Sequence, residues 1–300
     1  MNQKDFAYLA EVLRKRSGLS LTEKKSHLVA SRLAPVMRRF GFKDLCSLLH
    51  ELRHGHEALV SAVIEAMTVN DSAFFRDRKT FEEFRDIVLP DLLVARARSK
   101  RLRIWCTACA AGQEPYSIAM ILNDSKLAAL GWTIDVIATD LSSEMIARAQ
   151  DGLYSQFEVQ RGLPIRRLVG NFTQEGNSWR ISENLRRMVD FRAFNLLDSF
   201  GWLGEIDVVF CRNVLMYFDQ RARTSVLTRI SEILAPDGAL LVGPAELVPG
   251  NVGDFEKAEQ APGLYYRARL TAPLLRHRLK KGGSRIAAAS LGYRLARTPA

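Results

Sequence analysis

Long apolar segments are absent from this 300-residue chain, and cysteine is scarce. No apolar run approaches the ~20 residues that a bilayer-spanning helix needs. Polar residues, rather than the apolar centre of a signal peptide, follow Met1. The four cysteines, Cys46, Cys106, Cys109 and Cys211, are too few and too widely spaced for a disulfide scaffold. These absences predict a cytoplasmic protein without stable membrane insertion.

Basic residues outnumber acidic ones by ten, which raises the question of a nucleic-acid partner. Residues 271–300 carry seven of these charges and contain no acidic residue. Their composition predicts a basic, disordered tail, with a partner-binding or membrane-surface role as the alternative. The rest of the chain shows no basic surface interleaved with aromatic residues. We therefore expect no nucleic-acid partner.

The first part of the chain has a helical pattern. Through residues 1–75, apolar residues recur at intervals of three and four, without strand-like alternation. Gly18 and Gly41 mark helix ends, and Thr22 followed by Glu23 marks a helix start. The pattern predicts an all-helical N-terminal domain over residues 1–75.

A different pattern begins near residue 100, where short apolar runs alternate with amphipathic helices. This alternation predicts an α/β fold, with a parallel sheet covered by helices on both faces. The expected domain spans 101–270, and residues 76–100, which contain Pro90, are expected to form an interdomain linker segment. The alternative for residues 74–84 is that they already pack on the domain that follows. Residues 160–193 break the alternation and predict a small antiparallel β insertion. The expected strands are 102–106, 134–138, 206–210 and 239–242.

Small residues follow the first expected strand and precede a helix. Such residues let a ligand approach the backbone, and the helix N-terminus presents unpaired N–H groups. The segment lacks a GxGxxG pattern, so the residues alone allow either a cofactor loop or a plain tight turn. Cys106 and Cys109 form a single CxxC pair without a second pair or a nearby histidine. We therefore expect no metal or redox site there.

Polar residues also close two later strands. In dinucleotide-binding folds, a carboxylate placed like Asp140 accepts hydrogen bonds from ribose hydroxyls, although a helix N-cap before Ser142 is the alternative. The apolar run that ends at residue 211 gives way to Arg212 and Asn213 and resumes toward Tyr217. Together these side chains offer paired donors, an amide and a hydroxyl, which predict a site for an acidic group.

The sequence around two further features gives less support for a functional role. Residues 67–77, Met-Thr-Val-Asn-Asp-Ser-Ala-Phe-Phe-Arg-Asp, set polar groups around an apolar pair. Alone, they are as typical of an interdomain loop with Phe74 and Phe75 docked in a core. Glu246 and His50 have no motif around them, so we interpret both as surface or locally satisfied groups.

Four segments together resemble the chemotaxis receptor methyltransferase (CheR) family. They are residues 67–77, Gly-Gln-Glu-Pro-Tyr-Ser at 112–117, Ala-Thr-Asp at 138–140 and Cys-Arg-Asn-Val-Leu-Met-Tyr-Phe-Asp at 211–219. The resemblance covers the chain to about residue 270. It implies a Rossmann-like class I methyltransferase that transfers a methyl group from S-adenosylmethionine to glutamate side chains of chemoreceptors. The products would be glutamate methyl esters and S-adenosylhomocysteine, with no metal required.

The resemblance also implies a set of cofactor-binding residues. Three would reach the cofactor from the interdomain segment, one would hold its methionine end, one its ribose, two would flank its adenine, and two would line the methyl-transfer pocket. In that order they are Asn70, Ser72 and Arg76, then Glu114, Asp140, Asn195 and Leu196, and finally Arg212 and Asn213.

No side-chain base is expected, because an ionised glutamate is already a nucleophile and the sulfonium is a positive leaving group. The enzyme then mainly has to align the reacting atoms and exclude water. Arg76 and Arg212 would orient the incoming carboxylate through paired N–H donors, and Tyr217 would fix it or the methionyl group. These three residues are the predicted catalytic residues.

Basic residues on the helical part suggest where a partner binds. Lys25, Arg32 and Arg39 recur at intervals of seven on a helix expected over residues 22–40, so they share a stripe. A solvated charged face is the ordinary meaning of such a stripe. The resemblance implies instead that it contacts the acidic methylation region in the cytoplasmic part of chemoreceptors. We expect a monomer, and the competing functions are an RNA-directed methyltransferase and a non-catalytic S-adenosylmethionine-sensing protein.

Overall fold

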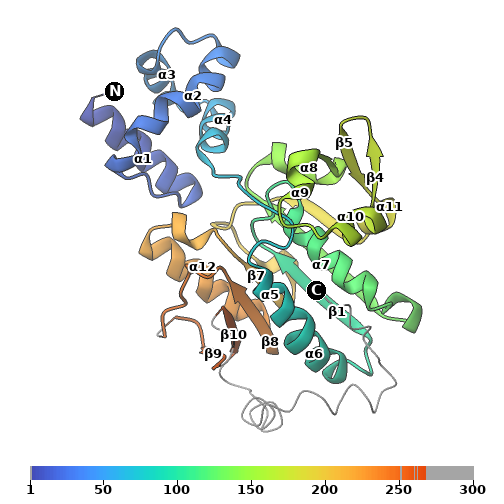
Figure 1. Cartoon of the computed structure of the whole chain (residues 1–300). Coiled ribbons are helices and arrows are strands. Elements are labelled where there is room, and N and C mark those ends of the chain that lie inside the picture. The colour runs from blue at the N-terminus through green and yellow to red at the C-terminus, as the bar shows by residue number, and fades with distance from the viewer. Residues whose placement is uncertain (1, 251, 260, 262, 268–300) are drawn as a thin grey trace.

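The computed structural model describes residues 2–250, 252–259, 261 and 263–267. The predicted basic tail, residues 271–300, lies outside them. The described chain forms an N-terminal group of helices and an α/β part built around one large sheet (Figure 1). None of the described helices is long and apolar enough to cross a membrane.

The N-terminal part is helical, as the apolar spacing predicts. Gly18 and Gly41 end the two longer helices in the left-handed conformation, both at φ 75°, which confirms the two predicted helix ends. Apolar stripes on the helices face one another and bury a core that includes Leu9, Leu33 and Leu49. The helices are α1 Gln3–Ser17, η1 Glu23–Lys25, α2 Ser26–Phe40, α3 Leu45–Leu52 and α4 Glu57–Met67.

The segment predicted as an interdomain linker is instead helical and packed. Residues 76–100 contain α5 Arg78–Glu83, the π-helical turn η2 Phe84–Val88 and α6 Leu89–Ala95. Phe81 and Phe84 are buried in the same core as the central strands. Pro90 stands at the start of α6, where its missing N–H costs no helical hydrogen bond. This segment therefore belongs structurally to the α/β part.

Seven strands form one sheet in the order β6-β2-β1-β7-β8-β10-β9. The strands from β6 to β8 are parallel, and β10 and β9 add an antiparallel edge, which confirms the predicted parallel α/β sheet. The strand order reverses between β1 and β7, and open α/β sheets bind ligands at the carboxyl ends of strands at such a point. The strands are β1 Arg101–Cys106, β2 Thr133–Asp140, β6 Val189–Ala193, β7 Ile206–Cys211, β8 Leu234–Val242, β9 Phe255–Lys257 and β10 Leu264–Arg267.

Helices cover both faces of the sheet. Neighbouring residues of a strand point to opposite faces, so each strand contributes side chains to both cores. Ile104 packs in the core beneath α5, α6 and α7, whereas Trp105 packs in the core beneath α12. All of β7 is buried, as expected of a central parallel strand. The helices of this part are α7 Gln113–Asp124, η3 Ala128–Leu130, α8 Ser143–Asp151, η4 Gly201–Leu203, η5 Leu215–Tyr217 and α12 Gln220–Ile233.

A small antiparallel sheet is present, but its bounds differ from the predicted 160–193. It begins earlier, at β3 Leu153–Ser155, and the segment Val189–Ala193 belongs to the main sheet, where it pairs with β2. A turn with Gly176 in the left-handed conformation joins β4 Phe172–Glu175 to β5 Ser178–Ile181. The helices around it are α9 Gln156–Gln160, α10 Ile165–Asn171 and α11 Glu183–Arg187.

Four hydrogen bonds and a β-bridge help to dock the helical part on the loops at the carboxyl ends of the strands. The backbone N–H of Ser20 donates to the carbonyl of Tyr217 at 2.7 Å, beside a bridge between the neighbouring residues. Asn195 Nδ2 donates to the carbonyl of Arg16 at 2.7 Å. On α4, Glu65 Oε1 accepts from Ser142 Oγ at 2.7 Å and from the N–H of residue 144 at 3.0 Å. The helical part therefore covers the switch point of the sheet, which is the place between β1 and β7 where the strand order reverses.

Candidate active site

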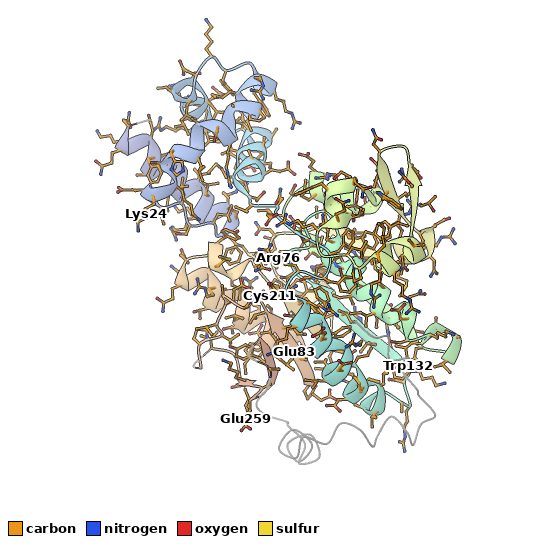
Figure 2. The ribbon with its side chains drawn as sticks, in the orientation of Figure 1. Lys24, Arg76, Glu83, Trp132, Cys211 and Glu259 are labelled. Atoms are coloured by element: carbon orange, nitrogen blue, oxygen red, sulfur yellow. The ribbon has the colours of Figure 1, made fainter. Side chains whose placement is uncertain are left out.

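A pocket lies where the helical part meets the carboxyl ends of β1, β2 and β7. It holds roughly 850 Å³ of space, including its mouth, within the usual size of a small-molecule site. All ten residues predicted to bind the cofactor or to act in catalysis line this pocket. Ser17 and Leu19 of the helical part also line it, and the sequence analysis did not single them out. Arg76 and Cys211 lie near this junction (Figure 2).

The loop between β1 and α7 forms one wall of the pocket. Its backbone turns through left-handed conformations at Ala110, φ 47°, and Gly112, φ 92°. A Cβ atom at Gly112 would lie 3.0 Å from both Ala149 Cβ and the ring of Tyr116, so the tight packing and the positive φ together favour glycine. Thr107, Ala108 and Ala110 border the pocket from this loop. Of the two predicted alternatives, the location favours the cofactor loop.

The CxxC pair in this loop is buried and has no metal-binding partners among the described residues. Burial raises the pKa of both thiols, Cys106 and Cys109, well above the ordinary value, so they are neutral at physiological pH. The pair acts as small apolar core residues.

Asp140 joins two elements at the end of β2. Its Oδ2 accepts from the N–H of Ala110 at 2.8 Å, and its Oδ1 accepts from the N–H of Ser142 at 3.0 Å. Burial raises the pKa of Asp140 despite these backbone donors. The alternative predicted for it, a helix N-cap, is wrong, because Ser142 itself caps α8 through its hydroxyl and the N–H of Met145.

Arg212 is buried in the pocket wall with most of its donors engaged. Its Nη1 donates to Glu114 Oε2 at 2.6 Å, and its Nη2 donates to the carbonyl of Arg76 at 2.6 Å and to Asp77 Oδ2 at 2.8 Å. The guanidinium also lies 5.3 Å from the ring centre of Phe81. Arg212 therefore fixes Glu114 and the segment at 76–77, and these contacts leave no paired donors for an incoming carboxylate.

Arg76 is the guanidinium that remains accessible in the pocket wall. Its side chain is 34% exposed, and its Nη1 donates to the carbonyl of Asp71 at 2.7 Å. Asp71 is itself paired with Arg161 at 2.6 Å, which anchors the segment that carries Arg76. Of the two arginines predicted to orient an acidic group, the geometry supports Arg76.

The loop after β7 depends on a residue that the sequence analysis interpreted as a surface or locally satisfied group. Glu246 is only 5% exposed, and its carboxylate accepts from four backbone N–H groups. They belong to Asn213 at 2.6 Å, Val214 at 2.9 Å, Met216 at 3.2 Å and Gly243 at 2.9 Å. Asn213 has a left-handed backbone, φ 56°, so this carboxylate holds a strained turn in place. The available signal was an acid shortly after the carboxyl end of β8.

Tyr217 lies at the end of this loop and borders both parts of the chain. Lys25 Nζ lies 5.5 Å from the centre of its ring, within cation–π range. Because Tyr217 lines the pocket, this contact places one basic residue of the helical part at the pocket rim.

The predicted basic stripe is not a continuous surface. The expected helix over 22–40 is divided into η1 and α2. Lys25 lies at the pocket rim, whereas Arg32 turns toward α4, where its Nη1 donates to the carbonyl of Met67 at 2.7 Å. Arg39 is exposed near the far end of α2. Arg32 therefore stabilises the end of α4, and only the other two members are open to a partner.

The residues of this pocket fit S-adenosylmethionine. Glu114 and Asp140 are buried carboxylates suited to an ammonium group and to ribose hydroxyls, and Glu114 Oε1 accepts no hydrogen bond within the described chain. Burial raises the pKa of Glu114, opposed by Arg212. Arg212 Nε is a buried donor without a partner among the described residues. Such unsatisfied groups are what a polar ligand completes.

Two family sequence models match consecutive parts of the chain. "CheR methyltransferase, all-alpha domain" matches residues 4–68, and "CheR methyltransferase, SAM binding domain" matches residues 70–264. The chain belongs to the CheR methyltransferase family. CheR membership shows S-adenosylmethionine binding and methyl transfer, and it supports the class I methyltransferase fold.

Named relatives cover most of the chain. Chemotaxis protein methyltransferase 1 of Pseudomonas aeruginosa is 38% identical over 269 residues, which are 88% of this chain and 98% of the relative. Chemotaxis protein methyltransferase Cher2 of Pseudomonas putida is 37% identical over 270 residues, with the same two coverages. A solved TehB-like SAM-dependent methyltransferase from Corynebacterium glutamicum is 17% identical with a TM-score of 0.33, over 64% of this chain and 91% of that chain.

Proposed function

We propose that this CheR-family methyltransferase esterifies glutamate side chains of chemoreceptors with the methyl group of S-adenosylmethionine. The observation that carries the proposal is the pocket at the switch point of the sheet. It combines two buried carboxylates, Glu114 and Asp140, with an accessible guanidinium on Arg76 and an aromatic hydroxyl on Tyr217. This set suits a cofactor with an ammonium group and a substrate with a carboxylate.

When bound, the cofactor supplies a methyl group on a positive sulfur, which an ionised carboxylate attacks directly. The chain's own task is therefore to position the carboxylate and to exclude water. Arg76 reaches the pocket from the segment that joins its two parts, and its guanidinium orients the incoming glutamate through N–H donors. Because Arg76 is partly exposed, it positions the carboxylate without removing the nucleophilicity of its oxygen.

The other polar residues act on the cofactor and on one another. Asp140 holds the ribose hydroxyls, Glu114 the methionyl ammonium, and Asn195 and Leu196 border the adenine. Arg212 orients the Glu114 carboxylate through their direct hydrogen bond and opposes the rise in its pKa that burial causes. Asn70, Ser72 and Asn213 complete the wall of the pocket.

The receptor is the proposed partner, and it contacts the helical part. Lys25 and Arg39 are the members of the predicted stripe that remain accessible, and Lys25 lies beside Tyr217 at the pocket rim. An acidic methylation region would be attracted to these charges, which speeds the encounter and sets the register. The relatives named chemotaxis protein methyltransferases, at 37–38% identity, favour this function over RNA methylation.

The decisive experiment measures transfer of a labelled methyl group from S-adenosylmethionine to receptor-containing membranes. We expect label on the receptor that is released by mild base, as an ester is. Arg76→Ala should reduce transfer, whereas Arg78→Ala, a change two residues away on an exposed side chain paired with Glu82, should not. Label in RNA, or cofactor binding without any transfer, would replace the proposed function with one of its two competitors.

A further inference from the structure

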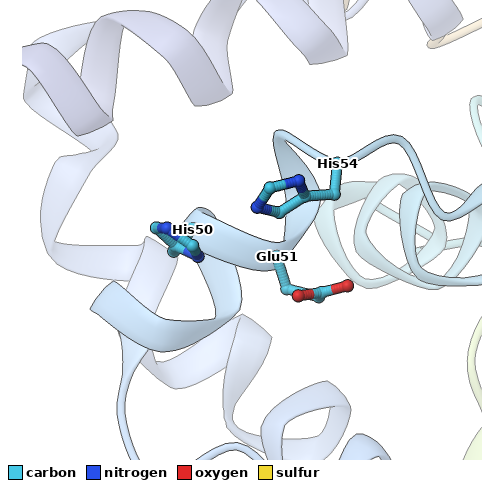
Figure 3. Close-up of side chains that lie close together, drawn as sticks. All are labelled: His50, Glu51 and His54. Carbon is cyan, nitrogen blue, oxygen red and sulfur yellow. The ribbon is translucent and has the colours of Figure 1, made fainter.

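Three of the five histidines of the chain lie within seven residues, at the end of α3 and in the turn that follows. His50 lies in the last turn of α3, and His54, four residues later, lies in the turn that follows the helix. Their ligating nitrogens and a carboxylate oxygen of Glu51 all lie within 4.8 Å of one another. Figure 3 shows the three side chains gathered at this end of α3.

The two imidazoles are available to a ligand. His50 and His54 are exposed, and their ring centres are 5.1 Å apart. Neither ring makes a hydrogen bond to any other described residue. Arg53, which lies between them in sequence, directs its charge elsewhere, because it pairs with Asp5 at 2.7 Å and lies 4.8 Å from the ring centre of Tyr8.

We propose that His50, Glu51 and His54 bind one divalent transition-metal ion, with Zn²⁺ as the representative ion. Neutral imidazole nitrogens and a carboxylate oxygen are ligands of Zn²⁺, and three protein ligands leave a position for water. Tetrahedral Zn²⁺ brings its ligand atoms to about 3.3 Å from one another, as follows from bond lengths near 2.0 Å. Exposed side chains reach that spacing by small rotations.

His56 supports the same assignment from outside the ligand set. Its Nε2 lies 2.8 Å from Glu51 Oε1. With His56 on Oε1, Oε2 is the oxygen left for the metal ion, and such a partner fixes the orientation of a ligating carboxylate. The mixture of imidazole and carboxylate favours Zn²⁺, Ni²⁺ and Cu²⁺ over Mg²⁺ and Ca²⁺, which prefer oxygen ligands alone.

The site lies outside the catalytic pocket, and the inference is independent of the proposed function. In Figure 1, α3 is on the side of the helical part that faces away from the sheet. A metal ion there joins the end of α3 to the turn that leads into α4. It would therefore stabilise the helical part by binding the folded form, without taking part in methyl transfer.

Calorimetric titration of Zn²⁺ into the full chain, free of any affinity tag and previously treated with a chelator, tests the proposal. We expect one ion per chain. His50→Ala and His54→Ala should each weaken binding at least tenfold, and Glu51→Gln should weaken it less. The matched control is His27→Ala, which removes an exposed histidine of α2 and should leave the affinity unchanged.

Two further measurements keep the test sharp. Thermal unfolding without metal should give the same midpoint for the wild type and all variants, and Zn²⁺ should raise the midpoint of the wild type but not of His50→Ala. Cys46, an exposed thiol one helical turn before His50, is the competing candidate for the third ligand. Unchanged affinity in both histidine variants would overturn the site. Loss of binding in Cys46→Ser with full binding in Glu51→Gln would overturn the assignment of Glu51.

Discussion

Arg212 Nη1 donates to Glu114 Oε2 across 2.6 Å, so two of the charged groups in the pocket wall are fixed by each other. Arg212 is almost fully buried, and Asp77 provides it with a second carboxylate at 2.8 Å. The pair links the loop after β7 to the start of α7, two elements that are 98 residues apart in the chain. Arg212 therefore holds the residues of the pocket wall in position, whereas the guanidinium of Arg76 remains accessible to the proposed substrate.

Replacing these two arginines should separate a structural role from a catalytic one. Arg212→Ala leaves the buried Glu114 carboxylate and the partly exposed Asp77 carboxylate without their partner, and the free energy of unfolding should fall by about 3–5 kcal/mol. Arg76→Ala should change it by less than about 1 kcal/mol, because that side chain is partly exposed, yet it should lower the rate of methyl transfer. Denaturant unfolding and initial rates measure both. A stable Arg212→Ala protein would contradict the role in organising the pocket.

Asp140→Asn should weaken binding of S-adenosylhomocysteine. The change removes the charged acceptor of the ribose hydroxyls, and a hydrogen bond to a charged group contributes about 1.5–3 kcal/mol. Calorimetry on the folded variant measures the difference. Asp135→Asn, at the other end of the same strand, is the matched control and should bind as the wild type does. Equal affinities in the two variants would remove Asp140 from the binding site.

Cofactor affinity should also depend on pH in a defined direction. Burial raises the pKa of Asp140 and of Glu114, so both carboxylates take up protons at a higher pH than ordinary carboxyl groups. The ionised forms are those that accept from the ligand. Affinity should therefore fall as the pH falls through these raised values, and calorimetry over a pH series measures the slope. The slope should be smaller in Asp140→Asn, and an unchanged slope would mean that another group titrates.

The same raised values affect folding with the opposite sign. An acid whose pKa is higher in the folded state holds its proton there after the unfolded chain has lost it. Its ionisation therefore lowers stability as the pH rises from the ordinary value, 3.8 for Asp140, through the raised one. For these two carboxyl groups, cofactor binding is thus favoured at higher pH, whereas their contribution to the stability of the free protein is larger at lower pH.

Glu246→Gln should reduce turnover more than it reduces cofactor affinity. The glutamine amide places N–H donors where the loop at 213–216 offers only donors, so at least one hydrogen bond to a charged acceptor is lost. We expect turnover to fall about tenfold or more and the unfolding free energy to fall by about 1.5–3 kcal/mol. Glu232→Gln, on the exposed side of α12, is the control. Wild-type turnover in Glu246→Gln would show that the loop keeps its shape without this carboxylate.

Charge reversal on the helical part should test partner docking, but only at suitable positions. Arg39→Glu should slow methylation of intact receptor while leaving cofactor affinity unchanged, and the deficit should shrink as salt is added. Lys25→Glu should act in the same direction, and Lys126→Glu on the α/β part is the control. Arg32→Glu is unsuitable, because it removes the donor to the carbonyl of Met67 and would destabilise the end of α4. Undiminished methylation in Arg39→Glu would place the docking surface elsewhere.

The helices and strands that could be predicted are those whose own residue pattern indicates where they pack. A mainly apolar strand such as β7, in which Asp207 is the one charged residue, is typical of the centre of a sheet, and a glycine such as Gly18 at the end of an apolar stripe is typical of a helix end. The segment 76–100 was different. Its short helices, with a π-helical turn and a proline, gave no sustained period, so packing on the next domain was only the alternative prediction, and only for residues 74–84.

Non-local partners explain the other differences. Residues 189–193 form a main-sheet strand because they pair with β2, about fifty residues earlier, which no local pattern indicates. The motifs brought all ten predicted residues to one pocket, although their roles remain predictions. Glu246 and Arg32 were misjudged because a carboxylate or guanidinium looks solvated until the backbone groups that it binds are known.

Ser17 and Leu19 give the pocket a wall that belongs to the helical part, and this makes two equilibria interdependent. A ligand in the pocket contacts both parts of the chain, so its binding favours their docked arrangement. Thermodynamic reciprocity then requires that any partner that loosens the docked arrangement weaken the ligand by the same factor. One coupling free energy therefore links receptor binding through the helices to cofactor binding between the two parts. It can be determined from the effect of the receptor on cofactor affinity or from the effect of the cofactor on receptor affinity.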